Sequence, residues 1–281
     1  MKPSNDSDYV RSQYHDAGNL SIRQRFHQLY STSKQPWQSW VFSHIDLPEC
    51  GTVLELGCGN GGLWLEKMER VSHSLEVTLA DVSPGLLQEA RANLIDRGLN
   101  VKFEVVDATQ MPYDAGSFDV VIANHMLYHL GDISAALAGI CHVLKPTGSF
   151  YASTVGLDNM SELQNFIWKS GWKVDLDLSS AAKSFGLENG GEILGRHFTQ
   201  VELLHYPDSL QVPTAEAVVD YIASLYPSET VPGELRRMLQ HEVNEHGLIH
   251  ITKSLGMFRC KEPCDLEPQS AGGSRSYDDH R

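Results

Sequence analysis

The stretch that most limits the fold of this chain is residues 53–62, VLELGCGNGG. Its mostly apolar start is typical of a β-strand, four glycines follow within six residues, and apolar side chains then recur at helical spacing. A strand, a glycine turn and a helix present backbone N–H groups and a helix N-terminus to a ligand. Glycine is needed there because a Cβ would collide with the ligand or forbid a positive φ angle. The stretch therefore predicts a ligand-binding α/β protein.

Glu55 indicates which ligand this turn suits. Gly57, Gly59 and Gly62 also fit the pattern G-x-G-x-x-G, which alone is a weak signal for NAD or FAD. Glu55 stands two residues before the first glycine, where the pyrophosphate of a dinucleotide would lie. A carboxylate repels an anionic ligand at short range, whereas it attracts an ammonium group and a sulfonium cation. S-adenosylmethionine carries both cations, so we favour it over NAD; a strand-to-helix turn without a ligand is the structural alternative.

Composition excludes several classes of protein. The chain has 281 residues, 41% of them hydrophobic, enough for one large core or a core with a smaller cap. A net charge of −14 argues against non-specific nucleic-acid binding, which needs basic surface. The polar start and the lack of a long apolar run predict neither a secretory signal nor a membrane span. Five cysteines without framework spacing indicate reduced thiols and a cytoplasmic location.

The apolar patterns divide the chain into segments. Residues 1–46 predict a helical cap, and residues 47–155 alternate strand and helix patterns, which predicts a doubly wound, mostly parallel sheet. Residues 156–247 form a variable insertion that lines the substrate pocket and contributes a sixth strand. Residues 248–260 predict a seventh and final sheet strand, for which an antiparallel direction is one option. Residues 261–281 are polar and predict a mobile tail.

Local patterns predict individual elements within these segments. Residues 101–106 alternate apolar and charged side chains, which fits an edge strand, whereas residues 119–123 are almost all apolar and fit a central strand. Ser83 followed by Pro84 predicts a helix N-cap and a first helical residue. Further helices are predicted over residues 160–172, 191–198, 215–225 and 233–246.

Two aspartates follow strand patterns and are candidates for binding a nucleoside. Ligands of open α/β sheets bind beyond the carboxyl ends of the strands. Asp81 follows Gly57 at roughly the twenty-residue spacing at which a carboxylate accepts hydrogen bonds from ribose hydroxyls. Asp107 is placed to accept from an adenine amino group, with the Ala108 N–H donating to a ring nitrogen. The alternatives are a helix-capping charge for Asp81 and a turn aspartate for Asp107.

Five motifs in order give the chain a family resemblance. VLELGCGNGG, LADVS, VVDATQMPY, FDVVIANHMLYHL and VLKPTGSF resemble those of class I S-adenosylmethionine-dependent methyltransferases, especially the small-molecule group of ubiquinone and menaquinone biosynthesis. The resemblance covers residues 52–155 strongly and residues 248–260 weakly. It implies a seven-stranded Rossmann-like sheet and S-adenosylmethionine as the cofactor. The motifs are specific for fold and cofactor and say little about the methyl acceptor, which is expected to be a small molecule.

The resemblance also implies which residues bind the cofactor. They are Glu55, Gly57, Cys58, Gly59, Asn60, Asp81, Val82, Asp107, Ala108 and Asn124. Glu55 and the glycines would shape the methionine end together with Asn124, Asp81 would hold the ribose, and Val82 would pack beside the adenine. Asn60 departs from the family, which often has Thr or Ser there, and an amide still donates and accepts hydrogen bonds.

The expected reaction is an in-line displacement at the methyl carbon, which needs alignment and, for a protonated acceptor, a base. His125 and His129 stand four residues apart just past the fourth strand and are the catalytic candidates. We expect His125 to contact the acceptor and act as the base; the alternative is that both histidines cap or pack. No third ligand completes a metal site near them, so no metal is predicted.

Aromatic residues of the cap are candidates for the acceptor pocket. Tyr14, Tyr30 and Trp37 are expected to reach over the cofactor, where an aromatic face stabilises a sulfonium. Packing of the cap on the core is the alternative for each of them. Two other functional classes stay open, namely a non-enzymatic S-adenosylmethionine-binding regulator and an NAD-dependent oxidoreductase. The oligomeric state is not predicted.

Overall fold

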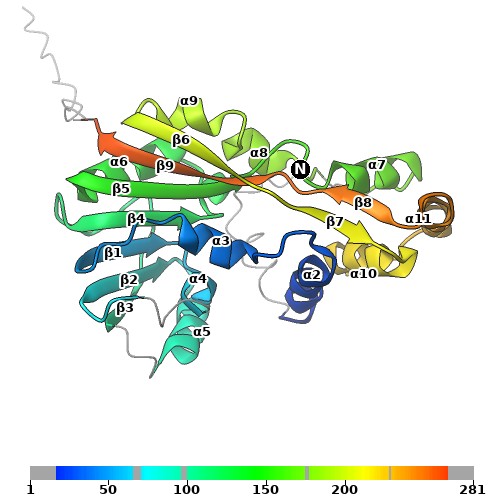
Figure 1. The fold of residues 1–281 in the computed structure, drawn as a ribbon, viewed down its shortest axis with the longest axis horizontal. Helices are drawn as coiled ribbons and strands as arrows, with labels where there is room; N and C mark the ends of the chain where they lie inside the picture. Colours follow the sequence, from blue (N-terminus) through cyan, green and yellow to red (C-terminus); the bar gives the residue numbers. More distant parts are fainter. Residues whose placement is uncertain (1–16, 66–70, 96–99, 175–176, 228, 265–281) are drawn as a thin grey trace, which may run out of the picture.

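The computed structural model describes residues 17–65, 71–95, 100–174, 177–227 and 229–264. Within these ranges the chain forms a seven-stranded sheet with helices on both faces and a separate two-stranded sheet (Figure 1). No helix in the described part is both long enough and apolar enough to cross a bilayer.

The order of the large sheet is β3-β2-β1-β4-β5-β9-β6. Strands β1 to β5 pair in parallel, and β9 lies antiparallel between β5 and β6. The prediction of a doubly wound, mostly parallel sheet of seven strands is therefore confirmed. The strands are β1 (Gly51–Leu56), β2 (Leu75–Asp81), β3 (Asn100–Val105), β4 (Phe118–Asn124), β5 (Leu144–Val155), β6 (Phe198–Tyr206) and β9 (Leu255–Pro263).

Alternate residues of each strand enter hydrophobic clusters on opposite faces of this sheet, because side chains alternate along a strand. Val53 packs into one cluster and its neighbour Leu54 into the other. One face is covered by α3 (Trp37–Ser43), α4 (Gly62–Leu65) and α5 (Pro84–Leu94). The other face is covered by α6 (Ile133–Val143), α8 (Ser180–Phe185) and α9 (Gly190–Leu194).

Local sequence signals position several of these elements as expected. The alternating strand β3 lies at the sheet edge, and the apolar strand β4 lies in the centre. Helix α5 begins at Pro84, and the Ser83 hydroxyl accepts a hydrogen bond from the Leu86 N–H at 3.4 Å. Helix α6 is capped in the same way, since the Asp132 carboxylate accepts from the Ala135 N–H at 2.9 Å.

A second unit, which we call the lobe, lies beside the carboxyl ends of the parallel strands. It contains β7 (Ser209–Val212), β8 (Ile249–Thr252), α2 (Ala17–Tyr30), α7 (Ser161–Lys169), α10 (Ala215–Leu225) and α11 (Gly233–His246). Figure 1 shows β6 leading into β7 and β8 leading into β9, so the lobe extends from two strands of the large sheet. Its buried residues, including Phe26, Leu163, Leu239 and Ile251, form a hydrophobic cluster of their own.

The structure corrects the predicted final strand. Residues 248–260 are not one strand, because β8 pairs with β7 in the lobe and β9 pairs in the large sheet. The break falls at the polar residues Lys253 and Ser254, where the Ser254 carbonyl accepts a hydrogen bond from the Gly156 N–H at 2.8 Å. Strand β9 also continues to residue 263, so the prediction of a tail from residue 261 starts three residues too early.

Two further segment boundaries differ from expectation. The helix predicted over residues 191–198 ends at Leu194, because Phe198 already begins β6. The cap predicted over residues 1–46 is divided, since α2 buries Phe26 in the lobe whereas α3 buries Trp40 against the large sheet.

Candidate active site

The glycine turn lies where β1, β2 and β4 end side by side. Gly57, Gly59 and Gly61 adopt φ angles of +64°, +56° and +77°, which L side chains rarely tolerate. A Cβ at Gly57 would meet the Met126 Cβ at 2.7 Å, so that glycine is also needed for packing. At Gly59 a Cβ would meet no described atom within 4 Å. The turn therefore leaves open space on the ligand-facing side of Gly59.

Asp81 fastens the turn to the end of β2. Its Oδ2 accepts a hydrogen bond from the Gly59 N–H at 3.0 Å, and its Oδ1 accepts from the Ser83 N–H at 2.8 Å. Burial raises the pKa of Asp81, while these backbone donors work in the opposite direction. The Val82 N–H is a third backbone donor to this carboxylate, which has about four acceptor positions, so acceptor capacity is left for a ligand.

Glu55 is buried beneath the turn and is covered by α4. Its Oε2 accepts a hydrogen bond from the Trp64 indole N–H at 2.6 Å, and its side chain is buried. Burial raises the pKa of Glu55 to about 8, and the charge of Asp81 adds to the shift. The preference for a cationic ligand inferred from sequence requires Glu55 to be ionised. In the ligand-free protein it is mostly protonated at neutral pH, and a bound cation would restore its charge.

Cys58 and Asn60 hold the backbone of the turn. The Cys58 N–H donates to the Ala80 carbonyl at 3.1 Å, and burial raises the pKa of its thiol, which stays neutral. Cys58 is thus a packed spacer and no nucleophile. The carbonyl of Asn60 accepts a hydrogen bond from the Asn93 amide at 3.0 Å.

The predicted adenine contacts gather at the ends of β2 and β3. Val82 is 51% exposed directly after Asp81, which provides an apolar surface for a flat ligand. Asp107 accepts at Oδ1 from the N–H and the hydroxyl of Thr109 at 2.8 and 2.7 Å, so it does stabilise a turn. Ala108 is buried beside it. Binding of adenine by these residues stays a prediction.

A chain of hydrogen bonds joins the end of β4 to α3. The Ser153 hydroxyl donates to the Asn124 side-chain oxygen, and the Asn124 amide donates to the Gln38 side-chain oxygen at 3.1 Å. The His125 N–H donates to the Ser153 hydroxyl at 3.0 Å. No sequence motif marks Gln38 or Ser153, because these contacts join residues far apart along the chain.

His125 is held in an unusual backbone conformation with a neutral ring. Its φ angle is +54°, a region that residues other than glycine seldom occupy outside functional sites. Its Nδ1 is buried and has no hydrogen-bond partner among the described residues. Burial lowers the pKa of His125 to about 3, and the positive charge of Lys253 and the His129 ring contribute. His129 ends the short helix η2 (Leu127–His129).

The structure separates the predicted aromatic contacts. Trp37 lies beside His125 with ring centroids 5.0 Å apart, and it stacks on Trp40 at 5.3 Å. Tyr30 packs edge-on against Phe26 in the lobe, 5.2 Å away. Tyr14 lies outside the described residues. Of the three, the described contacts bring only Trp37 to the histidine.

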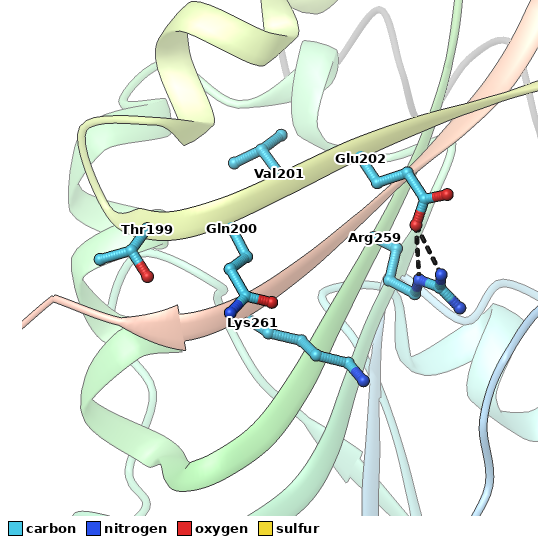
Figure 2. A pocket seen from close by; sticks show the side chains of 6 residues that line it. All are labelled: Thr199, Gln200, Val201, Glu202, Arg259 and Lys261. Atoms are coloured by element: carbon cyan, nitrogen blue, oxygen red, sulfur yellow. Dashed lines mark hydrogen bonds and ion pairs between the residues drawn. The ribbon is translucent and has the colours of Figure 1, made fainter.

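A polar groove lies elsewhere on the molecule (Figure 2). Its volume is about 360 Å³, and it is lined by Thr199, Gln200, Val201, Glu202, Arg259 and Lys261. Lys261 pairs with Ser149 in the middle of β5, and Ser149 pairs with Val120 near the start of β4, so the groove lies toward the amino ends of the parallel strands. It is therefore at the end of the strands opposite to the glycine turn.

No group of three or more His, Cys, Asp or Glu residues in the described part could hold a metal ion.

Curated sequences resemble part of this chain. A ubiquinone biosynthesis O-methyltransferase of Xanthomonas axonopodis pv. citri is 36% identical over 109 residues, which are 38% of this chain and 44% of that protein. A ubiquinone/menaquinone biosynthesis C-methyltransferase of Idiomarina loihiensis is 37% identical over 114 residues, 40% of this chain and 45% of that protein. The match thus spans about half the length of these relatives.

Solved structures resemble a larger part of the chain. A putative methyltransferase from Bacillus halodurans C-125 superposes with a TM-score of 0.55 and 15% identity, covering 81% of this chain and 99% of that one. Haemonchus contortus phosphoethanolamine N-methyltransferase 2, solved in complex with S-adenosyl-L-methionine, gives 0.51 and 16%, covering 94% of this chain and 61% of that one. At such low identity these likenesses show the fold alone.

The family profile described as "Methyltransferase domain" matches residues 49–199, more than half of the chain. The matched region runs from just before β1 into β6, so it includes the glycine turn, Asp81 and the Asn124–His125 corner. The chain belongs to this methyltransferase domain family.

Proposed function

We propose that this protein is an enzyme that transfers a methyl group from S-adenosylmethionine to a small-molecule acceptor. The observation that carries the proposal is the open, glycine-lined space at Gly59 with Asp81 and the buried Glu55 around it. The named ubiquinone-biosynthesis relatives and the neighbour solved with S-adenosylmethionine support it.

The five cysteines are free thiols, which supports a reducing compartment such as the cytoplasm.

The residues around the turn fit the three parts of this cofactor. Asp81 would accept from the ribose hydroxyls with its remaining acceptor capacity, and Val82 would cover one face of the adenine. Glu55 lies beneath the turn, where an ammonium group would favour its ionised form. When bound, S-adenosylmethionine supplies an electrophilic methyl group, whose bond to sulfur breaks as the acceptor attacks.

His125 is proposed to position the acceptor. A histidine with a pKa of about 3 is neutral at physiological pH and is a weak base for an un-ionised alcohol. Its buried Nδ1 has no described hydrogen-bond partner, which supports a role in bonding an acceptor that reaches this ring. We therefore propose that His125 orients the acceptor, an effect that accounts for much of the rate in in-line displacements; the base role expected from sequence stays a prediction.

Titration calorimetry with S-adenosylhomocysteine, alongside NADH, tests the proposal. We expect S-adenosylhomocysteine to bind and NADH not to bind. Asp81→Asn should weaken binding by about 1.5–3 kcal/mol, the scale of losing a hydrogen bond to a charged group. Glu76→Gln, an exposed change on the same strand, serves as the matched control and should bind normally. Tighter binding of NADH, or unchanged affinity in Asp81→Asn, would refute the assignment.

A further inference from the structure

A buried lysine lies where the large sheet meets the lobe. Lys253 occupies the break between β8 and β9, which the Gly156–Ser254 hydrogen bond of 2.8 Å holds beside the carboxyl end of β5. The Lys253 side chain is only 9% exposed. Among the residues that the structure describes, its one ion pair is with the Asp208 Oδ2, at 3.5 Å. Burying a charge is unfavourable unless it is well paired. Burial accordingly lowers the pKa of Lys253, while Asp208 acts in the opposite direction, so an anionic partner would stabilise the ammonium form.

Asp208 neutralises Lys253 incompletely. Its Oδ1 accepts hydrogen bonds from the Ser31 hydroxyl at 2.7 Å, from backbone N–H groups of residues 32 and 33 at 3.1 and 3.0 Å, and from the Ser209 N–H at 2.9 Å. These donors fix the carboxylate to the segment between α2 and α3. Its Oδ2 lies 3.5 Å from the Lys253 ammonium, at the long limit of a hydrogen bond, so this contact is a weak one.

Three further buried polar atoms of this region have no hydrogen-bond partner among the described residues. Trp37 Nε1, His125 Nδ1 and His27 Nδ1 are each buried without a hydrogen-bond partner in the described part of the chain. The Lys253 charge helps to lower the pKa of both histidines, so both rings lie within its field. Nearly all buried polar atoms in native proteins have partners, and a cluster without protein partners is satisfied by ordered water or by a ligand.

The chemistry of these atoms restricts the ligand. An ammonium and an indole N–H can only donate, so Lys253 and Trp37 both require an acceptor. The neighbouring walls are flat, since Trp37 contacts the rings of His125 and Tyr206 at 5.0 and 5.1 Å. Donors beside aromatic walls suit a flat, largely apolar molecule that carries an oxygen anion.

We infer that Lys253 binds an anionic oxygen group, such as a carboxylate or an ionised hydroxyl, on a flat, largely apolar methyl acceptor held between His125 and the lobe. This inference rests on the proposed methyl transfer and names its substrate class. An acceptor that is already ionised needs no general base, which agrees with the neutral His125.

Two matched dyes test this site in the full-length protein saturated with S-adenosylhomocysteine. The probe is 1-anilinonaphthalene-8-sulfonate, a flat aromatic anion, and its neutral partner is N-phenyl-1-naphthylamine, which has the same rings without the sulfonate. Fluorescence titration should show that Lys253→Met weakens binding of the anion by about tenfold or more, the scale of a lost charge-assisted hydrogen bond. Binding of the neutral dye should not change.

The exposed Lys261 in the groove of Figure 2 provides the matched control. Lys261→Met removes the same charge from a surface position and should leave binding of both dyes unaltered. Failure of the anion to bind the wild-type protein, or equal affinity in Lys253→Met, would overturn the inference.

A second variant keeps the test decisive if Lys253→Met disturbs folding, which loss of neutral-dye binding would reveal. Asp208→Asn keeps a side-chain oxygen for residues 31–33 but removes the competing negative charge. It should therefore tighten binding of the anionic dye about threefold or more, and unchanged or weaker binding would contradict the inference.

Calorimetry on the same samples separates this inference from the proposed function. S-adenosylhomocysteine should bind wild-type and Lys253→Met protein equally, because Lys253 lies outside the glycine turn. If S-adenosylhomocysteine does not bind the wild-type protein, the proposed function fails. If it binds while the dye titrations give the contradicting result, only the assignment of Lys253 fails.

Discussion

At the scale of single residues, Glu55 and His125 show how burial sets a charge state. Both side chains are ionisable, and burial moves their pKa values in opposite directions, to about 8 for the acid and to about 3 for the base. Each group is therefore mostly neutral at physiological pH without a ligand. Burial is the main cause of both shifts, and the hydrogen bond from Trp64 opposes the shift of Glu55. The burial comes from contacts between separate elements, such as Trp37 against His125, which leave no local sequence motif.

Glu55 makes the stability of the protein depend on pH. Its folded pKa of about 8 is above its unfolded value, so the folded state binds more protons in between and its stability falls as the pH rises through that window. Glu55→Gln does not titrate and its amide oxygen can still accept from Trp64. The difference in unfolding free energy, variant minus wild type, should increase by about 2–4 kcal/mol as the pH rises from 5 to 8, since each pKa unit corresponds to about 1.4 kcal/mol.

Urea unfolding at several pH values measures this difference. A constant difference between the two proteins across the window would show that Glu55 ionises normally. The same variant should lose affinity for S-adenosylhomocysteine at pH 8, where wild-type Glu55 ionises most readily beside an ammonium group.

His125 should affect the rate without producing a pH transition near neutrality. With saturating cofactor and acceptor, His125→Ala should lower kcat by about tenfold, as expected for lost orientation. The kcat profiles of the variant and the wild type should run parallel between about pH 5.5 and 8, because a group with a pKa of about 3 does not titrate there. A wild-type transition near pH 6.5 that disappears in His125→Ala would restore the base role. His129→Ala provides the comparison, and a larger loss there would assign the contact to His129.

At the scale of elements, α3 closes the carboxyl edge of the sheet. Trp40 and Phe42 bury its inner side, and Phe42 contacts the Trp64 ring at 5.9 Å above Glu55. Gln38 extends from the same helix to Asn124. The helix therefore contacts both the methionine side of the proposed cofactor site and, through Trp37, the acceptor side.

Loss of the link from α3 should weaken cofactor binding moderately. Gln38→Ala removes the partner of Asn124, and we expect a loss of about 0.5–1.5 kcal/mol in S-adenosylhomocysteine affinity, the net worth of a typical hydrogen bond. Gln240→Ala, on an exposed face of α11, is the control and should bind normally. Calorimetry gives both values; if Gln38→Ala binds as tightly as the control, α3 does not support the cofactor.

At the scale of the whole molecule, the hydrophobic core is divided into sheet and lobe. Leu79 is fully buried in the sheet, and Leu239 is fully buried in the lobe. Each change to Ala should lower the unfolding free energy by about 2–5 kcal/mol. Leu239→Ala should nevertheless keep its affinity for S-adenosylhomocysteine while acceptor turnover falls. Leu79→Ala, two residues before Asp81, should lose affinity. Equal losses of cofactor affinity in both variants would show that the two units do not act separately.

The large sheet could be predicted from sequence because each strand, turn and helix carries its own local pattern. Ser83 and Pro84, the glycine turn and the alternation in β3 are examples, and all appear in the structure as expected. The lobe could not be predicted in this way. Strand β7 has only four residues, and the helices α10 and α11 separate it in the sequence from its partner β8. No local pattern therefore marks the pair.

The same distinction applies to the candidate site. Residues that end a strand, such as Asp81 and Asn124, lie at the predicted edge. Contacts that form only when two separate elements meet could not be predicted. They are Trp64 with Glu55, Gln38 with Asn124 and Lys253 with Asp208. The polar break at residues 252–254 was a usable signal, because polar residues interrupt an apolar run that reads as one strand.

Most of the lobe is one insertion in the sequence between β6 and β9. This arrangement has a practical consequence for engineering. Exchanging residues 207–254 for those of a relative would leave every pairing of the large sheet untouched. The transplanted segment would pack against α2 and α7 of the host chain and not against those of the relative, because these two helices come from elsewhere in the chain. A chimera that folds must therefore exchange α2, α7 and residues 207–254 together. Exchange of residues 207–254 alone should yield insoluble protein.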